Sequence, residues 1–132
     1  MSIVYALEPN LTAEEFRSVL IASTLGERRP VDDLERLQSM LKHADIVMTA
    51  RDVGKLVGIS RAITDFSFCC YLSDLAVDVA YQKQGIGKKL IQETHQAAGL
   101  QTTLTLVSAP AALEYYPKIG LQSFPCFGIK RS

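Results

Sequence analysis

The feature that most constrains this chain is the stretch from Asp74 to Leu90, which reads DLAVDVAYQKQGIGKKL. An apolar strand, Leu75 to Val77, leads through a polar turn to two glycines and then into a helix that carries lysines. Such a turn leaves several backbone N–H groups unpaired at the positive end of a helix dipole, an arrangement that binds phosphate. We therefore expect the chain to hold a phosphate-bearing cofactor here.

Two common glycine loops do not fit this stretch. A Walker loop needs a glycine five residues before its Gly-Lys pair and a Ser or Thr after the lysine, but Gln82 occupies the first place and Lys89 the second. A dinucleotide-binding fingerprint needs a third glycine where this chain has Leu90. Both motifs are excluded.

Length and charge limit the classes of protein that this chain can belong to. Its 132 residues, 48% hydrophobic and 21% charged, predict a single globular domain over residues 1–132. The 14 basic and 14 acidic residues cancel, so no broad positive field is expected to attract nucleic acid or an acidic membrane.

The sequence shows neither a targeting signal nor a metal or disulfide framework. The start, MSIVYALEPN, has no basic region followed by a long apolar run, and we expect a cytoplasmic protein without membrane spans. Cys69 and Cys70 are adjacent, no C-x-x-C spacing exists, and only His43 and His95 could assist a metal. We expect reduced cysteines and no metal.

The first third of the chain predicts a strand and two helices. The strand is Ile3 to Leu7, and the capping box from Thr12 to Glu15 starts a helix that should end at Gly26. The second helix starts at Asp32 and has apolar residues at helical spacing as far as Ala44.

The middle of the chain predicts antiparallel strands. Ile46 to Ala50 and Leu56 to Thr64 should pair across a tight turn at Arg51 to Gly54. Phe66 to Cys69 either extends the second strand or forms the next turn, and Tyr71 to Val77 is the strand that enters the glycine loop.

The remainder of the chain predicts a parallel crossover followed by short elements. A helix from Gly85 to Ala98 should connect the loop to a strand, Thr102 to Val107, that pairs parallel to the strand before the loop. Gly99 should end this helix, and its inward residues should be Ile86, Leu90, Ile91, Thr94 and Ala98. Pro110 to Tyr116 is expected to be a short helix, with closing strands at Leu121 to Phe124 and Cys126 to Lys130. The predicted order is β-α-α-β-β-β-α-β-α-β-β, an α/β (α+β) fold.

Two motifs resemble one known family. Gln-x-x-Gly-x-Gly, present at Gln82 to Gly87 after an apolar strand, resembles the pyrophosphate loop of the GNAT superfamily of acetyl-CoA-dependent N-acetyltransferases. The segment Ala111 to Leu121 resembles the family element A-x-x-x-Y-x-K-x-G-F. The resemblance implies the GNAT fold, a mixed and mostly antiparallel central sheet flanked by helices.

The resemblance also implies a cofactor and the residues that bind it. The cofactor is acetyl-CoA, whose pyrophosphate would be held by backbone N–H groups of the loop and whose pantetheine arm would pair with the preceding strand. The side chains of Lys83, Lys88 and Lys89 are further candidates for phosphate contacts. The residues implied are Leu75, Ala76, Val77, Gln82, Lys83, Gln84, Gly85, Ile86, Gly87 and Lys88.

Catalytic roles follow from the same resemblance. A backbone N–H near Val77 would stabilise the oxyanion, and Tyr116 matches the family's general acid. An alkylamine is protonated at neutral pH, so a carboxylate base would help, and Asp74 is the first candidate, with Asp78 and Asp65 behind it. Tyr116 as a packed aromatic residue and Asp74 as a structural aspartate are the alternatives.

Three positions depart from the family pattern. Ala109 stands where many members have an asparagine that contacts the cofactor. Pro117 follows Tyr116 directly and is expected to disfavour helical geometry at the tyrosine. Leu121 replaces a phenylalanine, which alters packing only.

The acceptor is the least determined part of the prediction. The same resemblance implies transfer of the acetyl group to a primary amine of a small molecule or peptide, by direct attack in a ternary complex. It places the acceptor in a cleft flanked by Gly26 to Pro30 and Ser123 to Phe127. Arg28 and Arg29 either contact an acceptor carboxylate or are solvated. The alternatives are a non-catalytic acetyl-CoA-binding sensor or interaction module on the same fold and an enzyme acting on charged transfer RNA. A homodimer is also possible.

Overall fold

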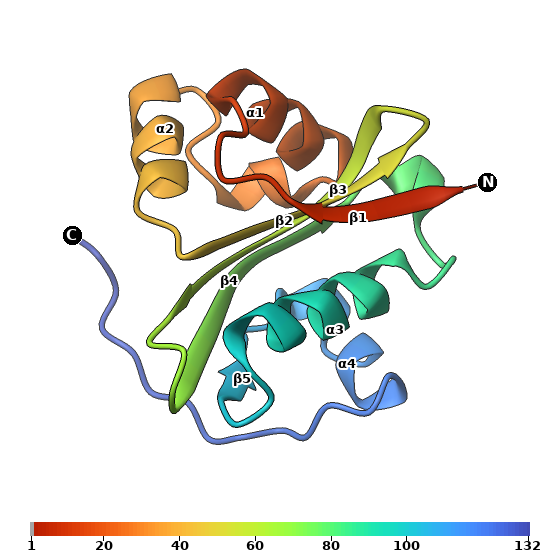
Figure 1. Cartoon of the computed structure of the whole chain (residues 1–132). Coiled ribbons are helices and arrows are strands. Elements are labelled where there is room, and N and C mark those ends of the chain that lie inside the picture. The colour runs from red at the N-terminus through yellow and green to blue at the C-terminus, as the bar shows by residue number, and fades with distance from the viewer. Residues whose placement is uncertain (1) are drawn as a thin grey trace.

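Five strands form one sheet in a computed structural model that describes residues 2–132 (Figure 1). Across the sheet they lie in chain order, and β1 to β4 are antiparallel while β5 pairs parallel to β4. This is the mixed, mostly antiparallel sheet that the sequence predicts. The strands are β1 (Ile3–Leu7), β2 (Ile46–Asp52), β3 (Lys55–Thr64), β4 (Cys69–Val77) and β5 (Thr103–Thr105).

Helices α1 (Ala13–Ala22) and α2 (Leu34–Lys42) cover one face of the sheet (Figure 1). The hydroxyl of Thr12 accepts the N–H of Glu15 at 3.1 Å, which confirms the predicted start of α1. Helix α1 ends at Ala22 rather than at Gly26, and the chain continues as a short 3₁₀ helix, η1 (Leu25–Arg28). The ending is local, because the Ser23 hydroxyl donates to the Leu20 carbonyl and accepts the N–H of Leu25. The core on this face includes Phe16, Leu20, Leu37, Leu41, Val47, Ile59 and Ala76.

The predicted hairpin of β2 and β3 is confirmed, and its turn is shorter than expected. Val53 and Gly54 both have positive φ angles, 47° and 84°, so two residues close the hairpin and the strands extend to either side of them. Between β3 and β4, one oxygen of Asp65 accepts the backbone N–H groups of Ser67, Phe68 and Cys69. These bonds make a turn there, and β4 begins at Cys69.

Helix α3 (Ile86–Ala98) lies on the opposite face of the sheet (Figure 1). Its predicted inward residues are all buried, and Gly99 ends the helix with a φ of 106°. The second core lies beneath it and contains Ile46, Met48, Ala50, Val57, Ala62, Cys70, Ile86, Leu90 and Ala98.

The chain after α3 is less regular than predicted. Strand β5 has three residues instead of six, and the expected helix from Pro110 to Tyr116 is split into a 3₁₀ helix η3 (Pro110–Ala112) and helix α4 (Tyr115–Lys118). A 3₁₀ helix η2 (Val79–Tyr81) also precedes the glycine loop.

The prediction of two closing strands is wrong: residues 119–132 contain neither helix nor strand. Within residues 2–132, the last backbone hydrogen bond runs from the Leu121 N–H to the Tyr116 carbonyl. Pro125 has no N–H for a ladder, and Phe127 and Ile129 are almost fully exposed, so a strand here would bury no apolar face. The tail instead follows the outside of the molecule (Figure 1).

Candidate active site

Strands β4 and β5 diverge, and the divergence leaves part of β4 with an open edge. They pair only between Cys69–Tyr71 and Thr103–Thr105, and from Leu72 onward β4 has no strand on that side among residues 2–132. The N–H of Asp78 donates to the Val57 carbonyl of β3. Because alternate residues of an antiparallel strand face opposite edges, the backbone groups of Leu75 and Val77 point to the open edge.

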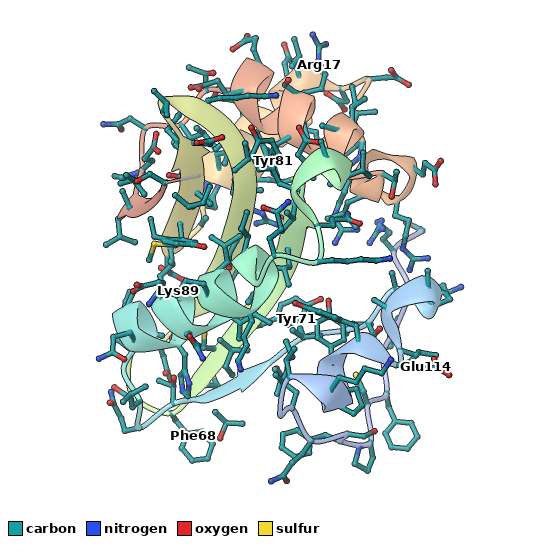
Figure 2. The ribbon with its side chains drawn as sticks, turned by 90° about the vertical axis from the view of Figure 1, so that its right-hand side faces the viewer. Arg17, Phe68, Tyr71, Tyr81, Lys89 and Glu114 are labelled. Atoms are coloured by element: carbon teal, nitrogen blue, oxygen red, sulfur yellow. The ribbon has the colours of Figure 1, made fainter. Side chains whose placement is uncertain are left out.

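The glycine loop that follows β4 is anchored at its start. Asp78 accepts the N–H of Ala80 at 2.9 Å, the Tyr81 hydroxyl donates to Asp52 at 2.9 Å, and the side chain of Gln82 donates to the Val77 carbonyl at 3.0 Å. In Figure 2, Tyr81 lies above Lys89 of α3. These bonds fix where the loop leaves the sheet.

The loop itself presents free amides. Lys83 and Gly85 have positive φ angles, 64° and 84°, which turn the backbone sharply at the start of α3. The N–H of Lys89 is bonded to the Gly85 carbonyl, but the amides of residues 83–88 donate to no backbone carbonyl in the described structure. With the positive end of the 13-residue helix behind them, they form a group of donors suited to an anion.

Gly87 is the point where β4, α3 and α4 meet. A Cβ placed on Gly87 would lie 3.0 Å from the Tyr115 hydroxyl oxygen and 3.8 Å from Cγ2 of Val77. Burial raises the pKa of Tyr115, while a hydrogen bond from the Lys88 backbone opposes that rise. Tyr115 was not predicted as a site residue, although its neighbour Tyr116 was. The signal in the sequence was the pair of adjacent tyrosines, because two consecutive residues of a short helix point their rings in different directions.

Tyr116 lies beside this junction. Its ring packs edge to face against Tyr115, with the ring centroids 5.3 Å apart. Burial is the main cause that raises the pKa of Tyr116 above 10.0, and the charge of Tyr115 adds to it. The expected disturbance by Pro117 is wrong: α4 includes both residues, because a proline in the first turn of a helix has no N–H that needs a partner.

Asp74 is enclosed by two arginines. Its side chain is fully buried on the face of β4 that carries α1 and α2. The Nε of Arg29 donates to one carboxylate oxygen at 2.5 Å, and the Nε of Arg61 donates to the other. The carboxylate therefore has no oxygen free of an ion pair to accept a proton from an incoming amine.

The two other candidate bases are also engaged. Asp78 caps η2 through the N–H of Ala80. Asp65 lies at the turn between β3 and β4, where hydrogen bonds from backbone N–H groups, that of Phe68 first, lower its pKa to about 2. A carboxylate with so low a pKa is a weak base at neutral pH.

The remaining predicted residues fall into two groups. Ala76 and Ile86 are buried, so only their backbones can face a ligand. The exposed side chains of Lys83, Gln84 and Lys88 extend from the loop, whereas Lys89 lies 3.4 Å from Glu93 one turn along α3. Of the two regions expected to flank the acceptor, the Gly26–Pro30 segment lies against β4 through Arg29, and residues 123–127 belong to the exposed tail.

Two shallow hollows on the surface lie away from this junction. One is lined by residues of β1 and the β2–β3 turn, and the other by the outer side of α3. Within residues 2–132, no helix is long and apolar enough to cross a membrane.

The expected cytoplasmic location and the possible homodimer are not tested by these observations and stay predictions.

Comparison with known proteins identifies the family of this chain. Residues 13–123 match the family model described as the acetyltransferase (GNAT) domain. The chain is 31% identical over 112 residues to histone acetyltransferase TAP1 of Glycine max, covering 74% of this chain and 47% of that protein. It thus spans about half the length of that relative.

Solved structures share the fold. A GNAT family acetyltransferase from Streptococcus pneumoniae superposes with a TM-score of 0.75 at 22% identity, covering 99% of this chain and 100% of that one. An aminoglycoside N-acetyltransferase in complex with CoA superposes with a TM-score of 0.75 at 16% identity, covering 99% and 95%. The predicted fold class is confirmed, apart from the two closing strands.

Proposed function

The chain belongs to the GNAT acetyltransferase family, and from that premise we propose that it transfers the acetyl group of acetyl-CoA to a primary amine of a small molecule or peptide. One observation carries the proposal: atoms of Val77 and Tyr115 lie within 4 Å of where a Cβ of Gly87 would be. That junction joins the open edge of β4 to the free amides of the loop. An extended ligand with an anionic end fits both.

Backbone groups, rather than side chains, would make most of the contacts with the cofactor. The amides of residues 83–87 and the positive end of α3 would bind the pyrophosphate, while that of Lys88 is directed at the Tyr115 hydroxyl. The backbone groups of Leu75 and the N–H of Val77 would pair with the pantetheine arm as an added strand, since the Val77 carbonyl already accepts from Gln82. The CoA complex of an aminoglycoside N-acetyltransferase with this fold supports the assignment. When bound, the thioester supplies an activated acetyl group.

Two groups of this chain would assist the transfer. The Val77 N–H faces the open edge, where it can donate to the carbonyl oxygen as negative charge develops. Tyr116 would protonate the departing thiolate, because a phenol is protonated at neutral pH and can donate its proton when the two groups touch.

The proposal assigns no aspartate to removing the amine proton, since Asp74, Asp78 and Asp65 are all engaged. That Asp74 is the base stays a prediction, which the experiment below tests. An amine of pKa roughly 10.4 would then react through its neutral fraction. Without a base, kcat/KM for the acceptor should rise about tenfold per pH unit between pH 6 and 9.

A sensor that binds acetyl-CoA without turnover is the second candidate. It is favoured by the exposed tail, which forms no hairpin beside the junction, and by Ala109 in place of asparagine. Calorimetric titration with CoA, followed by a thiol-release assay across an amine panel, separates the two. Binding with turnover supports the transferase, binding without turnover the sensor, and no binding refutes both.

A further inference from the structure

A cluster of three charges, two of them buried and that of Arg29 partly exposed, joins the segment after α1 to the sheet beside the proposed site. Asp74 of β4 lies opposite Arg61 of β3 in the strand register, and Arg29 reaches it from the end of η1. Two guanidinium groups thus surround one carboxylate. Burial of such charges is weak evidence for a gain in stability, because the cost of removing them from water offsets their attraction.

The hydrogen bonds of Arg29 are directed at β4 and at its own segment. Besides the Asp74 bond, one terminal nitrogen donates to the Ser73 carbonyl at 2.8 Å and the other to the Arg28 carbonyl at 2.8 Å. Arg61 donates to the Ser73 hydroxyl at 3.1 Å from the other side. The guanidinium of Arg29 is therefore fixed in orientation by three different acceptors.

Arg29 carries all the hydrogen bonds between residues 24–33 and the sheet in the described structure. The other bonds of this segment are local, such as Glu27 N–H to Thr24 and Asp33 N–H to Pro30. Its apolar anchors, Leu25 and Val31, are only partly buried. Without Arg29 the segment would keep its local turns and lose its polar attachment to β4.

The attachment point adjoins the reacting strand. Ser73 and Asp74 immediately precede Leu75 to Val77, the open edge proposed to align the thioester. We infer that Asp74 and Arg29 are positioning residues: Asp74 fixes Arg29, and Arg29 holds residues 25–33 against β4 so that this segment forms the acceptor side of the site. This inference rests on the proposed acetyl transfer for its kinetic test only.

The decisive variant is Arg29→Met, which leaves a balanced Asp74–Arg61 pair and so should fold. We expect faster amide hydrogen exchange in residues 25–33, a 10- to 100-fold loss of kcat/KM for the acceptor through its KM, and an unchanged KM for acetyl-CoA. Arg36→Met is the matched control, because this exposed arginine of α2 has no side-chain bond among the described residues. It should change neither readout.

Asp74→Asn separates positioning from base catalysis. As a positioning residue, Asp74→Asn should resemble Arg29→Met in exchange and acceptor KM and keep the pH profile. If Asp74 were the base, Asp74→Asn would lower kcat by about 10²- to 10⁴-fold and alter the pH profile, whereas Arg29→Met would change little. That result would overturn the inference. If Asp74→Asn does not fold, Arg29→Met decides alone.

Two further outcomes would overturn the inference. One is unchanged exchange of residues 25–33 in Arg29→Met, which can be measured even if no acceptor is ever turned over. The other is an equal effect of Arg28→Met, because Arg28 does not contact Asp74 and an equal effect would mean that the charge of the segment, not its attachment, sets acceptor affinity.

Discussion

The contact between Gly87 and Tyr115 makes a quantitative prediction about stability. Gly87 does not have a positive φ, so the backbone there accepts alanine without strain. The added Cβ would lie 3.0 Å from the Tyr115 hydroxyl oxygen, closer than an ordinary contact, whereas the Cζ atom of that ring is 3.9 Å away. The clash is therefore with the hydroxyl group alone.

The expected effects have opposite signs in two backgrounds. In the natural background, Gly87→Ala gains about 0.5 kcal/mol in helix propensity but forces the Tyr115 hydroxyl out of its place, and such overpacking costs about 1 kcal/mol. In Tyr115→Phe the hydroxyl is absent and only the gain is left. The coupling free energy between the two substitutions should be about 1 kcal/mol.

Urea unfolding of the four proteins measures this coupling. Gly85→Ala is the control, since no atom lies within 4 Å of its Cβ position and its cost should be the same in both backgrounds. If Gly87→Ala changes the free energy of unfolding equally with tyrosine and with phenylalanine at position 115, the proposed junction of α3 and α4 is incorrect.

Four further substitutions test the loop, the acid and the turn. Gly85→Ala should destabilise by about 1 kcal/mol and weaken CoA binding in calorimetry, because its φ is 84°, whereas Lys83→Gly, at a φ of 64°, should relieve strain and keep binding. Tyr116→Phe should lower kcat by at least about 100-fold with the Kd for CoA retained, and an unchanged kcat would remove Tyr116 from the mechanism. The pKa of Asp65 is lowered to about 2 in the fold, so its contribution is complete above pH 4 and disappears as the pH falls from about 4 to 2. Acid unfolding of Asp65→Asn should accordingly depend less on pH in that window, and an identical pH dependence would contradict the assignment.

Local patterns predicted the parts of the fold that local forces determine. The capping box at Thr12, the glycine at position 99 and the inward face of α3 all follow from spacing within one turn or one helix. The length of β5 does not, because it depends on where β4 diverges from it. The prediction of strands in the tail failed for a related reason. Alternation of apolar and polar residues predicts a strand, but a strand also needs a partner edge and a buried face.

The candidate site, like the fold, was predicted where it depends on neighbouring residues and missed where it depends on distant ones. The loop was predicted because its function lies in consecutive backbone groups. The surroundings of Asp74 were not, since Arg29 is 45 residues away in sequence and nothing near either residue signals the other. Tyr115 was overlooked because two adjacent tyrosines can be told apart only by where each ring points.

The alternation of β4 explains how these functions coexist in one short strand. Leu75 and Val77 direct their backbone groups to the open edge, while the side chains of Asp74 and Ala76 face α1 and α2. Contacts to the proposed cofactor thus use main chain, which substitution does not remove, and the attachment of residues 25–33 uses side chains, which substitution does. Changes at Arg29 or Asp74 should therefore alter the acceptor side and leave CoA affinity nearly constant, whereas a proline at Val77 would remove the N–H at the open edge and affect both.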